Sequence, residues 1–285
     1  MSSFASKPLS VSEFQRKVKA AGKMHHRDLP WRYIDDPYGV LVSEVMLQQT
    51  QVKRVLDYWP RFMRTFPSID ALAAAETSLV LEIWQGLGYN RRALALKKCA
   101  ETCSRDYRGC LPDEREELLA LPGIGPATAG GVLAFAYQKP ALYLETNVRT
   151  VFLHELFPDE HDVPDKLIEP LVLESCPSED PRGWYYALLD YGAYLKATEP
   201  NPSRRSKHYS KQSKFEGSRR QKRAEILRIL LASEALAKSQ IIDELAQFER
   251  EHKRNAPDEA LVEGILADLV SEGFLRLENG LYSVG

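Results

Sequence analysis

The sequence predicts a mainly α-helical protein that ends in a small module of mixed helices and strands. Up to about residue 200, apolar residues recur at spacings of three and four, and no stretch alternates as a half-buried strand would. Beyond that point, short amphipathic helices precede a segment that alternates around Asn279-Gly280, a strong signal for a two-residue hairpin turn. The predicted fold class is therefore mainly α, with a small α+β domain at the C-terminal end.

The composition is that of an ordinary globular protein. The 285 residues and 32.3 kDa allow one large domain or two modest ones, and 44% apolar with 27% charged residues argues against disorder. No apolar run approaches the length of a membrane-spanning helix, and the first residues lack the apolar core of a secretory signal. We therefore expect no membrane association and a cytoplasmic location. The four cysteines fit no C-x-x-C spacing, so we expect no disulfide framework.

The helices of the first 200 residues are separated by proline and glycine. Helical patterns cover residues 42–66, 78–88 and 91–107. The breaks fall at Pro67, Gly86, Gly88, Gly109, Pro112, Pro122, Gly123 and Gly125.

The C-terminal module is predicted to contain three helices and a hairpin. The predicted helices span residues 223–232, 240–248 and 259–273. Asp258 is the predicted N-cap of the third helix. Three helices followed by a hairpin resemble a winged helix, a variant of the helix-turn-helix. Charge does not favour DNA contact by the third helix, which carries Glu259, Glu263 and Asp268, so a module that only packs against the body or a partner is the alternative.

A basic segment precedes this module. Residues 203–223 carry nine Lys or Arg and one Glu, a local net charge of +8 in a chain whose overall charge is -2. Such a segment indicates contact with a polyanion, and the interleaved His208, Tyr209 and Phe215 favour nucleic acid. A solvated flexible linker is the alternative.

A short glycine-rich turn lies between two helical runs at residues 121–125. Gly123 and Gly125 allow close backbone approach, and the helix that follows, which contains Thr128, offers free N–H groups at its N-terminus. This arrangement is typical of a phosphate-binding site. A tight structural turn between helices is the competing interpretation.

Two carboxylates occupy unusual positions. Glu44 lies inside the apolar helical run LVSEVML, and Glu145 lies just ahead of another helical run. An ionised carboxylate in apolar surroundings is costly unless it has partners or a function. Taken singly, a surface position for Glu44 and a helix N-terminal charge for Glu145 are the simpler explanations.

Five motifs occur in a characteristic order along the chain. They are LPWR at residues 29–32, SEVMLQQT at 43–50, WQGLGY at 84–89, LPGIG at 121–125 and LETNVR at 144–149. In this order and spacing they resemble the endonuclease III superfamily of DNA glycosylases, and most closely its MutY adenine-glycosylase branch, over roughly residues 27–198.

The resemblance implies a two-lobed helix-hairpin-helix fold plus the winged-helix-like domain. The expected parts are a discontinuous helical lobe at 1–30 and 136–202, a six-helix lobe with the hairpin at 31–135, a basic linker or DNA-contact segment at 203–222, and the winged-helix-like domain at 223–285. It also implies a monomer that binds double-stranded DNA containing a mispair or lesion, nucleoid-associated if the source is prokaryotic.

The resemblance assigns roles to particular residues. Glu44 corresponds to the general acid that protonates the flipped adenine, and Glu145 to the carboxylate that stabilises the oxocarbenium-like sugar, supported by Asn147. The other residues that it implies around the base and the DNA are Arg27, Arg32, Leu47, Gln48, Gln49 and Tyr89. The carbonyls that it implies for a structural Na⁺ or K⁺ at the hairpin are those of Leu119, Leu121 and Ile124.

The sequence departs from the family at several points. Glu145 stands where the family has Asp, one methylene shorter. Ala127 stands where bifunctional members have the Schiff-base lysine and where MutY enzymes usually have a hydroxyl, so we expect a monofunctional enzyme without lysine-based lyase activity.

Two further departures concern cofactors and substrate. No cysteine follows Thr198, so we expect no [4Fe–4S] cluster. We expect other residues to take over the phosphate contacts of the cluster loop, namely Arg204, Arg205, Lys207 and His208. The winged-helix-like module stands where MutY enzymes have a NUDIX-like domain, so the resemblance leaves open whether the adenine must lie opposite 8-oxoguanine. We expect a monofunctional DNA glycosylase of base excision repair that flips out a mispaired or damaged base, with adenine favoured, and hydrolyses its N-glycosidic bond. A glycosylase for alkylated purines or mismatched T or U, and a non-catalytic binder of damaged or structured DNA, stay open as alternatives.

Overall fold

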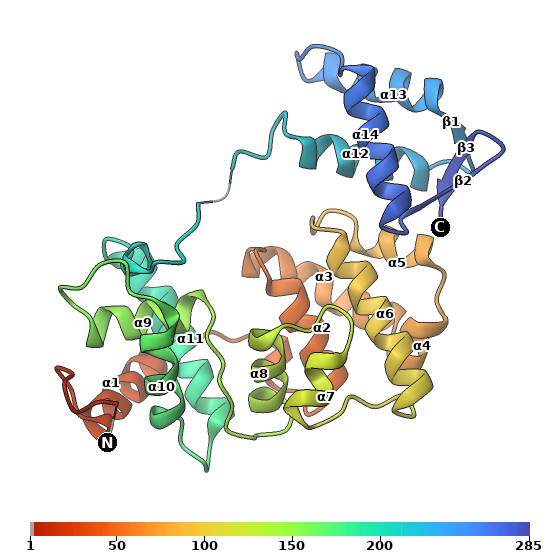
Figure 1. The fold of residues 1–285 in the computed structure, drawn as a ribbon. Helices are drawn as coiled ribbons and strands as arrows, with labels where there is room; N and C mark the ends of the chain where they lie inside the picture. Colours follow the sequence, from red (N-terminus) through yellow and green to blue (C-terminus); the bar gives the residue numbers. More distant parts are fainter. Residues whose placement is uncertain (1–2, 212) are drawn as a thin grey trace. The chain divides into compact units, whose positions relative to one another are not determined.

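The protein is described by a computed structural model that covers residues 3–211 and 213–285 (Figure 1). The structure is mainly helical with a small C-terminal sheet, which confirms the predicted fold class. By its internal contacts the chain divides into two compact units, Met1–Gln48 with Cys110–Lys211 and Gln49–Gly109 with Gln212–Gly285. Within the described residues, no helix is both long and apolar enough to cross a membrane.

The first unit consists of helices. They are α1 (Val11–Met24), α2 (Pro37–Leu47), α7 (Arg115–Ala120), α8 (Pro126–Phe135), α9 (Thr146–Leu156), α10 (Asp165–Ser175) and α11 (Pro181–Thr198), with two 3₁₀ turns, η1 (Pro30–Arg32) and η2 (Pro202–Arg205). Local sequence explains where α2 begins, because the Asp36 carboxylate accepts from the backbone N–H groups of Tyr38 and Gly39 and Pro37 fits the first helical position.

The core of this unit is built on α11, which packs against both α1 and α9. Phe14 of α1, Phe152 of α9 and Trp184 of α11 are fully buried, and the Phe14 ring contacts both of the others at centroid distances of 4.8 and 5.9 Å. Gly192 lets α11 approach α9 closely, since a Cβ there would lie 2.2 Å from the carbonyl oxygen of Asn147. Segments far apart in sequence therefore form one buried core.

The second unit joins four helices of the chain's first half to the C-terminal module. The elements are α3 (Val52–Thr65), α4 (Ile69–Ala74), α5 (Thr77–Trp84), α6 (Arg91–Asp106), α12 (Arg219–Leu231), α13 (Lys238–Glu251) and α14 (Glu259–Ser271), with strands β1 (Leu236–Ala237), β2 (Leu275–Glu278) and β3 (Leu281–Val284).

The module confirms the predicted helices and hairpin. Asp258 caps α14 by accepting from the N–H of Ala260, and β2 pairs antiparallel with β3 with Leu277 opposite Tyr282. Asn279 and Gly280 both have positive φ, 51° and 79°, as the predicted two-residue turn requires. The two-residue β1 completes a sheet of order β1-β3-β2, and it is too short to have left a sequence pattern.

Two helix boundaries differ from expectation. The helical pattern at 42–66 is two helices, because the chain turns between Leu47 and Val52 with Gln49 at φ 53°. The helix predicted to start at residue 223 begins at Arg219, because Ser218 caps α12. The two compact units meet after Gln48, Gly109 and Lys211, and the domain limits after residues 30, 135 and 202 stay predictions.

Candidate active site

Glu145 is the N-cap of α9. Its Oε1 accepts hydrogen bonds from the backbone N–H groups of Asn147 at 2.6 Å and Val148 at 3.0 Å. The Asn147 side-chain Nδ2 donates to Glu145 Oε2 at 3.4 Å, and Lys196 Nζ donates in turn to Asn147 Oδ1 at 3.3 Å. Burial raises the pKa of Glu145, whereas the two backbone N–H groups, Lys196 and Arg149 oppose that rise by stabilising the charged form. The site therefore holds a half-buried carboxylate against the positive end of a helix.

Glu44 lies on α2 in a different environment. Burial raises the pKa of its carboxyl group to about 8, the nearby Glu145 charge adds to the rise, and a hydrogen bond with the Tyr143 hydroxyl acts in the opposite direction. The carboxyl also packs against α8, because a Cβ on Gly131 would lie 2.5 Å from Glu44 Oε2. At neutral pH Glu44 therefore carries a proton that it can donate.

The two carboxyl groups have the properties of an acid and an electrostatic stabiliser. Burial raises the pKa of both groups, to about 8 for Glu44, but two backbone N–H groups at the start of α9 stabilise the charged form of Glu145. Glycosidic bond cleavage uses two carboxyl groups in different surroundings, one as the acid and the other as the stabiliser of positive charge.

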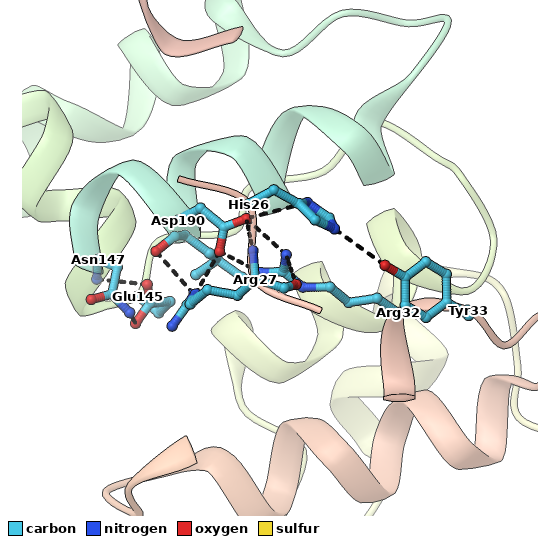
Figure 2. A network of polar contacts seen from close by, with 8 residues as sticks. His26, Arg27, Arg32, Tyr33, Glu145, Asn147 and Asp190 are labelled. Carbon is cyan, nitrogen blue, oxygen red and sulfur yellow. Dashed lines mark hydrogen bonds and ion pairs between the residues drawn. The ribbon is translucent and has the colours of Figure 1, made fainter. Parts of the chain in front are cut away.

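Two predicted arginines meet at a buried carboxylate that sequence reasoning did not identify. Arg32 forms a bidentate pair with Asp190 of α11, with both N···O distances 2.8 Å, and Arg27 Nε donates to Asp190 Oδ1 at 2.5 Å. In Figure 2, Glu145 and Asn147 lie on one side of Asp190, and His26 and Tyr33 lie on the other.

Asp190 therefore holds both arginines in place. The signal for it was present in the sequence, since it interrupts the apolar run ALLDYGAYL much as Glu44 interrupts LVSEVML. Arg32 also lies over the ring of Tyr186, with Cζ 4.5 Å from the centroid.

Other predicted site residues lie at the ends of helices. Gln48 is exposed at the C-terminus of α2 and donates to the Thr128 hydroxyl at 3.1 Å, while Leu47 is half-buried. Ala127 is exposed in the first turn of α8. Thr128 itself is buried, which places its hydroxyl inside the fold rather than at the surface.

Gln49 and Tyr89 belong to the second unit. Both have left-handed backbone conformations, with φ of 53° and 49°, which non-glycine residues rarely adopt. The Tyr89 hydroxyl accepts a hydrogen bond from Arg220 of α12 at 2.7 Å. Their predicted contacts with DNA stay predictions.

The glycine-rich turn at residues 121–125 joins α7 to α8, as predicted. Gly123 has φ 76°, the Ile124 N–H donates to the Leu121 carbonyl at 3.2 Å, and α8 starts after Gly125 with Pro126 at its first position. Within the described residues, no side chain caps this N-terminus. Its N–H groups therefore remain available to an outside anion.

The hairpin carbonyls fit a monovalent cation in their chemistry. The three predicted ligands, Leu119, Leu121 and Ile124, offer neutral hard oxygens, the donor type that alkali cations prefer. Among the described residues, no cluster of three or more His, Cys, Asp or Glu could hold a metal ion.

Arg205 of the basic segment has a structural role. Arg205 donates to the carbonyls of Leu153 at 2.9 Å and Phe157 at 2.7 Å, and also to that of Pro158, so it caps the C-terminal end of α9. The side chains of Arg204, Lys207 and His208 are exposed. Phosphate contact by these three residues and by Arg205 stays a prediction. In the structure, the Arg205 side chain is engaged with the carbonyl groups at the end of α9.

The fold and the paired carboxylates define a helix-hairpin-helix DNA glycosylase. The family model of the HhH-GPD superfamily of base excision DNA repair proteins matches residues 42–177. The adenine DNA glycosylase of Mycobacterium tuberculosis (strain ATCC 25618 / H37Rv) is 36% identical over 236 residues, which are 73% of this chain and 75% of the relative. The chain belongs to this superfamily, and its relatives place it in the MutY-like, adenine-glycosylase branch.

Further relatives and solved structures agree. The adenine DNA glycosylase of Buchnera aphidicola subsp. Baizongia pistaciae is 35% identical over 178 residues, 60% of this chain and 50% of that protein. A thermostable thymine-DNA glycosylase matches with TM-score 0.60 and 24% identity, covering 67% of this chain and 90% of its own. An endonuclease III–DNA complex matches with TM-score 0.57 and 22% identity, covering 67% of this chain and 90% of its own. At these identities the two structures support the fold alone.

Proposed function

We propose that the protein is a monofunctional DNA glycosylase of base excision repair that hydrolyses the N-glycosidic bond of a mispaired adenine. The observation that carries this proposal is the Glu44 carboxyl group on α2, whose pKa burial raises to about 8, together with Glu145 at the N-cap of α9. A protein that only bound DNA would need neither a stored proton nor a desolvated carboxylate.

The chemistry follows from the two carboxyl groups. The target adenine must leave the duplex before it can reach them. Glu44 donates its proton to the adenine ring, which lets the base leave with the electrons of the glycosidic bond. Glu145 stabilises the resulting oxocarbenium-like sugar, and water then adds to that carbon and loses a proton. The products are free adenine and an abasic site.

Ala127 supports the monofunctional assignment. Its methyl side chain lies in the first turn of α8 and offers no amine, so no Schiff base with the sugar can form through this position. Strand cleavage would then require alkali or a second enzyme.

DNA binding is proposed to use the open N-terminus of α8 together with exposed basic groups. Helix N–H groups and glycine backbone at Gly123 and Gly125 bind phosphate without reading sequence. Arg204, Lys207 and His208 would add contacts in place of a cluster loop. A Na⁺ or K⁺ held by the hairpin carbonyls would add positive charge near the same phosphate. We further propose that the protein acts as a monomer, without an iron–sulfur cluster, in the compartment that holds the DNA.

The test is an excision assay on labelled duplexes. They carry adenine opposite 8-oxoguanine, A·G, A·C, T·G, U·G or an alkylated purine, each scored with and without alkali for the wild type and Glu44→Gln. We expect alkali-dependent cleavage at an adenine mispair and a loss of about a hundredfold or more in the variant, because it cannot donate the proton. Cleavage only at T·G, U·G or the alkylated purine would contradict the adenine assignment, and tight binding without any cleavage would contradict the enzyme.

Loss of activity in Glu44→Gln will not come from unfolding. The pKa of Glu44 is raised in the folded protein, so Glu44 costs stability as pH rises from 4.5 towards about 8, where the folded state must keep a proton that the unfolded chain releases. Glutamine does not ionise, so the variant's melting temperature should equal or exceed that of the wild type across this range.

A further inference from the structure

An extended segment that ends at Glu145 packs directly on α8. A Cβ on Gly130 would lie 2.1 Å from the Leu142 carbonyl oxygen and 3.2 Å from Tyr143 Cα. A Cβ on the next residue, Gly131, would lie 3.0 Å from Tyr143 Cε2 as well as 2.5 Å from Glu44 Oε2. The two glycines therefore make room on α8 for the Tyr143 backbone and ring and for the Glu44 carboxyl group together.

The ring of Tyr143 is fixed by its neighbours. It is 5% exposed and packs edge-on against Phe135 at 5.1 Å and Tyr185 at 5.3 Å between ring centroids. The Tyr185 hydroxyl also accepts from the Tyr143 N–H at 3.4 Å. The Tyr143 hydroxyl interacts with the Glu44 carboxyl group, and the Tyr143 ring and that carboxyl group both lie against Gly131. A buried phenol therefore faces the carboxyl group of the acid.

Other titratable groups near Glu44 come from neighbouring helices. Glu145 at the start of α9 and Tyr186 of α11 interact with Glu44 electrostatically. Arg32 lies over the ring of Tyr186, and that ring stacks on Phe135 with a centroid distance of 4.6 Å and an interplanar angle of 6°. Tyr143 adds a hydroxyl group beside the carboxyl group.

We propose that Tyr143 is a positioning residue that orients the Glu44 carboxyl group for proton delivery through the hydrogen bond from its hydroxyl. This inference rests on the proposed function. Ala127 supplies no hydroxyl in the first turn of α8, and Tyr143 supplies one to the acid from the segment that also carries Glu145. One stretch of four residues, 142–145, thereby delivers both the group that holds the acid and the stabilising carboxylate.

The hydrogen bond would orient the acid before proton transfer and stabilise its carboxylate afterwards. With Glu44 protonated, the phenol donates to its carbonyl oxygen and leaves the acidic O–H directed away from Tyr143. Once Glu44 has given up its proton, the same phenol stabilises the carboxylate. Removing the hydroxyl should therefore slow the reaction and make Glu44 lose its proton at higher pH.

The test compares Tyr143→Phe with a matched control, Tyr185→Phe. Both variants remove a buried hydroxyl and keep the ring, but the Tyr185 hydroxyl bonds to the backbone of Ala141 and Tyr143 rather than to Glu44. We measure the single-turnover excision rate on either side of the Glu44 pKa. In Tyr143→Phe we expect the plateau of the pH–rate profile to fall about tenfold. The alkaline limb of that profile should move to higher pH by on the order of one unit. In Tyr185→Phe the limb should stay in place.

A second measurement does not need activity. The ¹³C carboxyl signal of Glu44, identified by its absence in Glu44→Gln, is titrated by NMR in the free wild-type protein and in both Tyr variants. The midpoint should rise in Tyr143→Phe alone. If no duplex is cleaved, the proposed function fails and this titration still decides the role of Tyr143. If the wild type cleaves but neither limb nor midpoint moves in Tyr143→Phe, or both move equally in Tyr185→Phe, the inference is wrong and the function stands.

Discussion

Helices α8 and α9 lie in the same unit and begin in opposite ways. The N-terminus of α9 is filled by the protein's own carboxylate, because Glu145 accepts from its first N–H groups. The N-terminus of α8 begins at Gly125, and no side chain of the described residues caps it. Every helix exposes the same positive end. The comparison teaches that the residue at the N-cap decides whether that end fixes an internal catalytic charge or stays open for an external phosphate.

Glycine at position 125 is not required by the backbone. Gly125 has φ -95° and ψ 175°, a conformation that any residue can adopt, and a Cβ there would meet nothing within 4 Å. What glycine provides at this position is the absence of a competing acceptor. The comparison can therefore be tested by exchanging the two kinds of cap.

The largest effect is expected from removing the N-cap side chain of α9. Glu145→Ala removes both the cap and the charge, so we expect the single-turnover excision rate to fall about 10²–10³-fold and the free energy of unfolding to fall by about 1 kcal/mol. Glu145→Asp keeps both, moves the charge by roughly 1 Å, and should melt like the wild type. Excision kinetics and thermal melts check this series. A wild-type rate in Glu145→Ala would reduce Glu145 to a structural cap.

A smaller effect is expected from adding an N-cap side chain to α8. Gly125→Asp would give α8 its own carboxylate, as Glu145 does for α9, and should add about 0.5 kcal/mol of stability. The same charge should repel phosphate and weaken duplex binding about tenfold. Fluorescence anisotropy with a mispaired duplex measures the affinity.

Gly125→Asn is the neutral control. Asparagine caps as well as aspartate but adds no charge, so its affinity should lie between those of the wild type and Gly125→Asp. Wild-type binding by both variants would exclude a phosphate at this helix end.

Stability and salt dependence, rather than the excision rate, should separate the two adjacent arginines. Arg205→Ala removes the cap on the C-terminal carbonyls of α9 and should lower the free energy of unfolding by about 1–3 kcal/mol. Arg204→Ala should leave the melting temperature unchanged and lower the salt dependence of DNA binding by about one ion. Thermal melts and binding at several salt concentrations distinguish them. Equal behaviour of the two variants would contradict the division of roles.

Local signals explain what the sequence could predict. Asp258 caps α14 and Asn279-Gly280 turns the hairpin because each acts on backbone within a few residues. The positions of Glu44 and Glu145 were also accessible, since a carboxylate in an apolar run or ahead of a helix is visible in a few letters.

Contacts between distant segments explain what the sequence could not predict. Gly131 matters because Glu44 contacts it from another helix. In the sequence Arg205 is indistinguishable from the exposed Arg204, and its role becomes visible in its contact with the end of α9. The break after Leu47 was missed because neither proline nor glycine marks it; Gln49 adopts the left-handed conformation instead.

The pairing of Asp190 with Arg27 and Arg32 also bears on how the protein is made. The arginines leave the ribosome early and their carboxylate follows more than 150 residues later, since the Arg32 and Asp190 contact spans 158 positions. Until α11 has emerged, the growing chain holds two cations that lack their counter-charge and a catalytic face that lacks one wall of its core. Chains fold as their segments are synthesised, and α1 and α9 both pack on α11, so neither this core nor the reactive site can be completed before α11 emerges. Synthesis itself thus delays the capacity to cut a glycosidic bond until the whole lobe is present.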